Sequence, residues 1–185
     1  MKPRKVCIDA GHGGQDNGTS GNGIAEDAWV LEFAGRLGHH LREHGVETVF
    51  TRTGDKKVAL ETRAAIAVNA GCDLFVAIHC NASSDNKADG AECFYVPVGD
   101  FKNSSIGVGR EMLAACMQEG LESRGVKIDS KSQHSKLAVL RGTCRHMPAV
   151  LLEVGFVSNK HDSDLQKSKV WREQLAQALA QAIVM

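Results

Sequence analysis

Short apolar runs separated by segments of helical periodicity constrain the fold of this chain more than any other feature of its sequence. The runs at 74–79 and 149–154 are apolar over nearly their whole length, which is typical of strands covered on both faces of a sheet. A sheet with one face in water would instead show polar residues at every second position. Six segments are predicted strands: 4–9, 46–51, 74–79, 91–96, 137–140 and 149–154.

Helical periodicity fills most of the segments between these runs. Phe33, Leu37 and Leu41 recur four residues apart in a helix that starts near Glu26, and Gly45 is a suitable stop. Further helices are predicted at 58–70, at about 105–123 and in a C-terminal segment up to 182. This alternation predicts an α/β fold, a single-domain sandwich over residues 1–185 with a central, largely parallel six-stranded sheet flanked by helices.

Composition excludes several classes of protein. The formal net charge is zero, which argues against a nucleic-acid-binding surface, and no apolar run reaches the length of a membrane span. The basic N-terminus enters a predicted strand without the apolar core of a signal peptide, so we expect a chain made in the cytoplasm. None of the six cysteines forms a C-x-x-C pair, and we expect all six thiols to be free.

Four residues are candidates for chemistry, since functional groups in a parallel sheet gather after the carboxyl ends of the strands. His12 follows the first predicted strand within the stretch GHGGQDNG, His79 and Glu153 lie at the ends of two others, and Glu26 opens the first helix. Two histidines and one carboxylate are a common set of catalytic zinc ligands. Each signal alone is weak, because such a histidine is more often a turn residue and such a glutamate usually serves the helix dipole.

Six blocks in this order resemble one known family: DAGHGGQDNGTSGNGIAE, TRTGD, ETRAAIAVNA, DLFVAIHCNA, LAVLR and PAVLLEVGFVSN. Together they are similar to the zinc-dependent N-acetylmuramoyl-L-alanine amidases, the type 3 amidase domain of bacterial cell-wall hydrolases and phage endolysins. The resemblance extends from about residue 5 to about residue 182. It departs from the family at Ala77, often a serine there, and at Cys80, often an alanine.

The resemblance implies one zinc ion per chain, held by His12, Glu26 and His79, with Glu153 as the catalytic acid and base. It implies hydrolysis of the amide bond between N-acetylmuramic acid and L-alanine in peptidoglycan. Family members with an inhibitory helix carry it after the N-A block, and this chain has no room for one there. We therefore expect no obligatory protein activator.

Other possibilities stay open at this level. A zinc peptidase that cuts stem-peptide bonds would use the same ligand types, and a non-catalytic wall-binding module would tolerate the loss of Glu153. Glu153 could instead be an ion-pair partner of Arg52 or Arg63, and these arginines could brace the sheet or contact substrate. His134 lies near the expected site without a clear role. The sequence carries no wall-binding repeat. We expect the protein to reach the cell wall by holin-type release.

Overall fold

A computed structural model describes residues 2–185 and contains a six-stranded sheet in the order β4-β1-β5-β8-β6-β7. Four neighbouring pairs are parallel, and only β6 and β8 run antiparallel. A separate two-stranded hairpin joins the first strand to the first helix. The strands are β1 (Lys5–Ala10), β2 (Ser20–Gly21), β3 (Ile24–Ala25), β4 (Glu47–Phe50), β5 (Leu74–Asn81), β6 (Ala91–Tyr95), β7 (Ser123–Ile128) and β8 (Ala149–Phe156).

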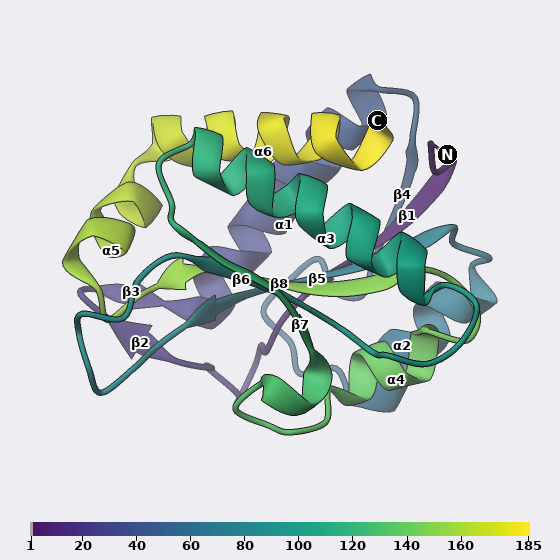
Figure 1. Ribbon diagram of the computed structural model, residues 1–185, viewed down its shortest axis with the longest axis horizontal. Coiled ribbons are helices and arrows are strands. Elements are labelled where there is room, and N and C mark those ends of the chain that lie inside the picture. The colour runs from purple at the N-terminus through teal and green to yellow at the C-terminus, as the bar shows by residue number, and fades with distance from the viewer. Residues whose placement is uncertain (1) are drawn as a thin grey trace.

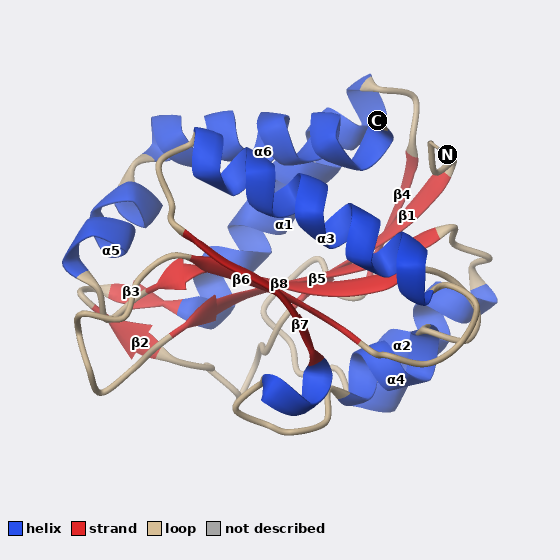
Figure 2. Ribbon diagram, viewed as in Figure 1, coloured by secondary structure: helices blue, strands red, loops and turns tan. Residues whose placement is uncertain are grey.

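Helices cover both faces of the sheet (Figure 1), so the predicted α/β sandwich with a largely parallel sheet is confirmed. α1, α3 and α6 form one layer, and α2 and α4 lie together on the opposite side, as the colouring in Figure 2 makes clear. The helices are α1 (Glu26–Glu43), α2 (Leu60–Asn69), α3 (Lys102–Gln118), α4 (Ala138–Thr143), α5 (Lys160–Lys167) and α6 (Lys169–Val184), with a short 3₁₀ turn at Asp129–Lys131.

Two apolar clusters hold the layers together. Alternate residues of the central strands, such as Val76 and Ile78, pack under α1, α3 and α6. The residues between them, such as Phe75 and Ala77, pack against α2 and α4. Because successive side chains of a strand point to opposite faces, strands with two covered faces must be apolar at every position. This explains the uninterrupted apolar runs of the sequence.

The face that packs on α2 and α4 changes character at the carboxyl end of the parallel strands. Ala77 is buried in the apolar cluster, but His79 and Asn81, two and four residues further on the same face, are polar. On β8 the apolar Leu151 is likewise followed by Glu153. The period of two therefore gathers polar side chains at one end of one face, beyond the reach of the two short helices.

The prediction of the sixth strand was wrong. Residues 137–140 are not a strand, since α4 begins at Ala138 and packs its apolar side chains against α2. A four-residue apolar run does not distinguish a strand from a buried helical turn. The true sixth strand, β7, lies at the sheet edge, where its residues are half-buried or exposed, so its sequence SRGVKI lacks an apolar run.

Helix boundaries also differ from the prediction. The third helix ends at Gln118 rather than near residue 123, because Gly120 adopts a positive φ and the chain then enters β7. α2 begins at Leu60 rather than at residue 58, and Leu60 itself is 50% exposed. None of the helices in the described part of the chain, residues 2–185, has the length and hydropathy needed to cross a membrane.

Candidate metal centre

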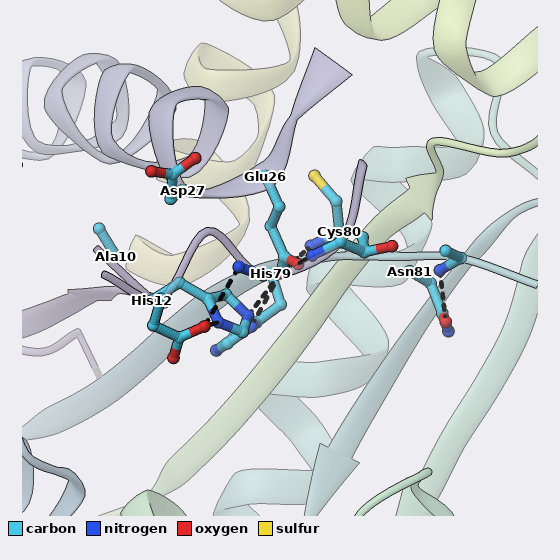
Figure 3. A network of polar contacts seen from close by, with 12 residues as sticks. Ala10, His12, Glu26, Asp27, His79, Cys80 and Asn81 are labelled. Carbon is cyan, nitrogen blue, oxygen red and sulfur yellow. Dashed lines mark hydrogen bonds and ion pairs between the residues drawn. The ribbon is translucent and has the colours of Figure 1, made fainter. Parts of the chain in front are cut away.

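Three predicted ligands converge at the carboxyl end of the sheet (Figure 3). His12 lies in the loop after β1, Glu26 is the first residue of α1, and His79 belongs to β5. Oε1 of Glu26 lies 3.2 Å from Nε2 of His12 and 3.0 Å from Nδ1 of His79. One ligand atom from each residue lies within 4.8 Å of the others, and this is the only such group of three or more found in residues 2–185. The three residues could together hold a metal ion.

The glycine-rich loop allows His12 to reach this position. His12 itself has a φ of 58°, a left-handed conformation that is uncommon for a residue with a side chain. Gly13 and Gly18, also at positive φ, continue the turn. At Gly18 a Cβ atom would lie 2.5 Å from Oε2 of Glu26 and 2.7 Å from Cδ2 of His12. The absent side chain at Gly18 therefore lets the loop close against two of the three candidate ligands.

Two buried arginines hold the same loop from behind. Arg52 donates hydrogen bonds to the carbonyl oxygens of Ala10 and Gly11, at 2.9 and 2.7 Å. Arg63 donates to the carbonyl oxygens of Ala10 and His12, at 2.7 and 2.6 Å. Three consecutive carbonyls are thus held by two guanidinium groups that are almost completely buried. Bracing, one of the two roles considered for these arginines, is the role that the structure supports.

Glu26 is only 3% exposed and is surrounded by hydrogen-bond donors. The backbone N–H groups of Thr19 and Cys80 donate to its two carboxylate oxygens, at 2.8 and 3.0 Å. Burial alone would raise the pKa of Glu26, but hydrogen bonds from His12 and His79 outweigh burial and hold that pKa well below its usual value. Burial lowers the pKa of His12, and its contacts with Glu26 and Asp16 outweigh this and raise that pKa to about 9. The cluster therefore favours a charged carboxylate.

Glu153 lies beside this cluster, and no Lys or Arg side chain in residues 2–185 forms an ion pair with it. It is the Cα partner of His79 in the ladder between β5 and β8. Its Oε2 atom is buried and finds no hydrogen-bond partner among residues 2–185. Burial, with smaller contributions from neighbouring charges, raises the pKa of Glu153 to about 7. Within the described chain neither Arg52 nor Arg63 forms an ion pair with it, which removes the support for a purely structural role.

Glu92 is a further polar residue of the site that the sequence analysis did not identify. It continues the series of polar side chains on neighbouring strands from His79 and Glu153 to β6. It is the Cα partner of Glu153 in the antiparallel ladder between β6 and β8. Its carboxylate accepts hydrogen bonds from the Asn81 amide, at 2.7 Å, and from the side chains of Arg124 and Lys127. A single carboxylate in a strand whose other residues are apolar was the signal in the sequence that could have pointed to it.

A cavity of about 730 Å³ opens over the cluster. The candidate ligands and Glu153 line it, together with residues 57–60 before and at the start of α2 and several residues of the segment 132–139. His134 lines this cavity but does not belong to the group of converging ligand atoms. Gln133 donates hydrogen bonds to Oδ1 of Asn81 and to the carbonyl of Ala82, which ties the 132–138 segment to the end of β5.

The cysteines take no part in the cluster. All six are free and buried. Cys80 follows His79 directly, but its sulfur points away from the His79 ring (Figure 3) and packs in the apolar cluster beneath α1. Burial raises the pKa of the Cys80 thiol well above its usual value, so the thiol stays protonated. The alternation of side chains along β5 thus separates the thiol from the candidate metal ligands.

Several known proteins are similar in sequence to this chain over most of its length. The Bacillus subtilis protein YqiI is 34% identical over 99% of this chain and 84% of its own length. The N-acetylmuramoyl-L-alanine amidase LytC of B. subtilis is 32% identical over 94% of this chain, and the endolysin of Bacillus phage SPP1 is 35% identical over 96%. This chain spans only 34% of LytC and 64% of the endolysin.

Solved structures share the fold. An N-acetylmuramoyl-L-alanine amidase from Clostridium difficile 630 matches 99% of this chain and 96% of its own, with a TM-score of 0.88 and 28% identity. The CwlD amidase of Clostridioides difficile, solved in complex with the GerS lipoprotein, matches 97% of this chain and 96% of its own, with a TM-score of 0.85 and 25% identity. The N-acetylmuramoyl-L-alanine amidase family itself matches residues 6–185, and this chain therefore belongs to that family.

Proposed function

We propose that this chain hydrolyses the amide bond between N-acetylmuramic acid and L-alanine in peptidoglycan and thereby degrades the bacterial cell wall. Its membership of the amidase family supplies the reaction. The observation that carries the proposal is the placement of three converging ligand atoms beside an unpartnered carboxylate oxygen of Glu153, in the lining of one cavity.

The donor set fits a zinc ion. Two imidazole nitrogens and one carboxylate oxygen are ligands that suit zinc, and three protein ligands leave a fourth position open. We assign Nε2 of His12, Nδ1 of His79 and Oε1 of Glu26 as the donors for one zinc ion per chain, because these atoms face one another. Zinc held there would polarise the scissile carbonyl and lower the pKa of water to about 7.

Glu153 is the proposed acid and base. Hydrolysis of an amide requires that a proton be removed from the attacking water and that a proton be delivered to the departing amine. One carboxyl group can perform both transfers in turn. A general base works best when its pKa lies near the operating pH, and burial raises the pKa of Glu153 to about 7. Its Oε2 hydrogen-bonds to no other residue from 2 to 185, so no fixed partner within these residues competes for the proton of this carboxyl group.

The alternatives are weaker. A zinc peptidase acting on stem-peptide bonds could use the same four residues, but the family and the relatives named above point to the amide at the sugar. A non-catalytic wall-binding module would have no use for a buried carboxylate without a partner, since burying such a group costs stability.

Two further parts of the proposal concern activation of the enzyme and its delivery to the cell wall. The nine residues 82–90, between β5 and β6, contain no helix, so the cavity is not covered from this side and no activator is needed to uncover it. We assign residues 1–185 as the catalytic unit, with delivery to the wall by holin-type release. The similarity to a phage endolysin supports this route.

Metal analysis of purified protein tests the site. We expect one zinc ion per chain in the parent protein and none in the His12→Ala, His79→Ala double variant. His134→Ala is the matched control, because His134 lines the same cavity outside the ligand group and its removal should leave zinc in place. Full zinc occupancy in the double variant would refute the assignment.

A further inference from the structure

Both ring nitrogens of His12 contact a carboxylate. Nε2 lies 3.2 Å from Oε1 of Glu26, on the side of the proposed metal position. Nδ1, on the other side of the ring, lies 2.9 Å from Oδ1 of Asp16. A neutral imidazole carries one N–H and one lone pair, so the group that bonds to one nitrogen decides which nitrogen remains free as a ligand.

Asp16 is built into the loop in a way that directs its carboxylate back to His12. Gly13 and Asp16 form an isolated bridge, with backbone hydrogen bonds of 2.8 and 3.3 Å in the two directions. The backbone N–H of Gly18 also donates to Oδ1 of Asp16, at 3.2 Å. The bridge thus fixes the Asp16 backbone and the Gly18 N–H holds its carboxylate, although the Asp16 side chain is 49% exposed.

His79, the other candidate histidine, is fixed differently. Its Nδ1 faces Glu26, and the Cε1 side of its ring packs directly on Gly11, where a Cβ atom would lie 2.2 Å from Cε1, 2.5 Å from Nε2 and 2.6 Å from Nδ1. Within residues 2–185 no side chain hydrogen-bonds to Nε2 of His79. In this part of the chain, His79 therefore has a side-chain hydrogen bond at one ring nitrogen only, whereas both ring nitrogens of His12 contact a carboxylate.

We propose that Asp16 is a positioning residue of the metal centre: it accepts the Nδ1–H of His12 and so holds Nε2 as the free ligand atom. A carboxylate behind a metal-bound histidine fixes its tautomer and ring orientation and makes it a better donor. The His12 ring also packs against Gly18 and edge-on against the His79 ring, but these contacts do not select which ring nitrogen carries the proton, so that selection falls to Asp16. The inference rests on the proposed metal site, and its test is a binding measurement.

The experiment compares the zinc affinity of three variants by competition with a chromophoric chelator. Asp16→Ala removes both the charge and the acceptor, and Asp16→Asn keeps an acceptor oxygen in place. Asp55→Ala is the matched control, since Asp55 anchors the same loop through a 2.6 Å hydrogen bond from the Gly14 N–H and contacts none of the ligands. The melting temperature of each zinc-free protein verifies that it is folded.

We expect Asp16→Ala to bind zinc about 10–100-fold more weakly than the parent. Asp16→Asn should be intermediate, and Asp55→Ala should stay close to the parent. Nitrogen-15 NMR of the zinc-loaded parent should show the His12 proton on Nδ1, and its resonance should be lost or shifted in Asp16→Ala. If Asp16→Ala does not fold, Asp16→Asn gives the decisive comparison.

Three results would overturn this inference alone. Unchanged affinity in both Asp16 variants would show that the ring needs no support. An equal loss in the Asp16 and Asp55 variants would assign the effect to anchoring of the loop. A His12 proton found on Nε2 would exclude the proposed tautomer. A parent protein that binds no zinc would overturn the metal site together with this inference, so the two failures are distinguishable.

Discussion

Glu153 lies directly opposite His79 in the parallel ladder between β5 and β8. Residues paired across neighbouring strands project to the same face of a sheet, about 5 Å apart. The distance between Glu153, the proposed acid–base residue, and His79, a proposed metal ligand, is therefore set by backbone pairing in the middle of the sheet. A catalytic pair carried by a rigid ladder is held more accurately than one carried by two loops.

The first prediction concerns the stability of the zinc-free protein. Burial raises the pKa of Glu153 from 4.5 to about 7, so the folded chain binds this proton more tightly than the unfolded chain does. Glu153 then contributes most to the stability of the folded chain below about pH 4.5, and this contribution is lost as the pH rises towards 7 and above. Glu153→Gln cannot ionise and does not suffer this loss.

The measurement is urea unfolding of the zinc-free parent and Glu153→Gln at pH 5 and pH 8. One pKa unit corresponds to about 1.4 kcal/mol. On going from pH 5 to pH 8, the unfolding free energy of Glu153→Gln should therefore rise by at most about 3 kcal/mol relative to that of the parent. A difference in unfolding free energy that does not change with pH would show that Glu153 is not desolvated in the folded chain.

The second prediction compares two glycines at positive φ. Gly18→Ala should abolish zinc binding, because the new Cβ would lie 2.5 Å from a Glu26 oxygen and 2.7 Å from a His12 carbon. Gly23→Ala is the control, since Gly23 has a φ of 81° and its Cβ would meet nothing within 4 Å. It should lose about 1 kcal/mol of stability and keep its zinc. Zinc loss in both variants would trace the effect to backbone strain alone.

The third prediction concerns the buried ion pair behind the loop. Arg63 lies 2.8 Å from Asp9, and both side chains are almost fully buried. Arg63→Met should cost about 3–5 kcal/mol in unfolding free energy, because it leaves the Asp9 carboxylate uncompensated. Adding Asp9→Asn should recover part of this loss, and Arg4→Ala, at a side chain 93% exposed, should cost about 0.5 kcal/mol or less. Strict additivity of the two buried substitutions would contradict the coupling.

Some of this fold could be read from the sequence because burial on both faces leaves a simple pattern. The apolar runs of β5 and β8 predicted two central strands, and the four-residue recurrence of Phe33, Leu37 and Leu41 predicted α1. β7 was missed because an edge strand contacts solvent and needs no apolar run. α4 was taken for a strand because the choice depends on packing against α2, a contact between distant segments.

The sequence predicted the residues that converge in the candidate site, but it did not predict the residues that support them. His12, Glu26 and His79 lie at element ends where a parallel sheet brings functional groups together, and the family resemblance gave each a role. Glu92 and Asp16 act through hydrogen bonds, to Asn81 and to His12, that only the folded chain brings within reach. Residue spacing does not encode such partners, since they depend on the three-dimensional path of the loop.

The fourth prediction concerns activation. The isolated chain should clear purified cell walls without a partner protein, because the nine residues that connect β5 to β6 include no helix that could cover the cavity. The related CwlD amidase was solved in complex with the GerS lipoprotein, so the outcome is informative. A turbidity assay with the purified chain alone tests it. Lysis that begins only after a partner is added or the chain is trimmed would contradict the prediction.

The most direct test of the account is product analysis of digested peptidoglycan with the parent protein and Glu153→Gln. Mass spectrometry should find intact stem peptides with a free L-alanine amino group and glycan strands that have lost them. Glu153→Gln should release these amines at least about 10²-fold more slowly, with its zinc content unchanged, because it loses only the proton acceptor. Cleavage within the stem peptide by the parent, or near-normal amine release by a folded, zinc-loaded Glu153→Gln, would contradict the account.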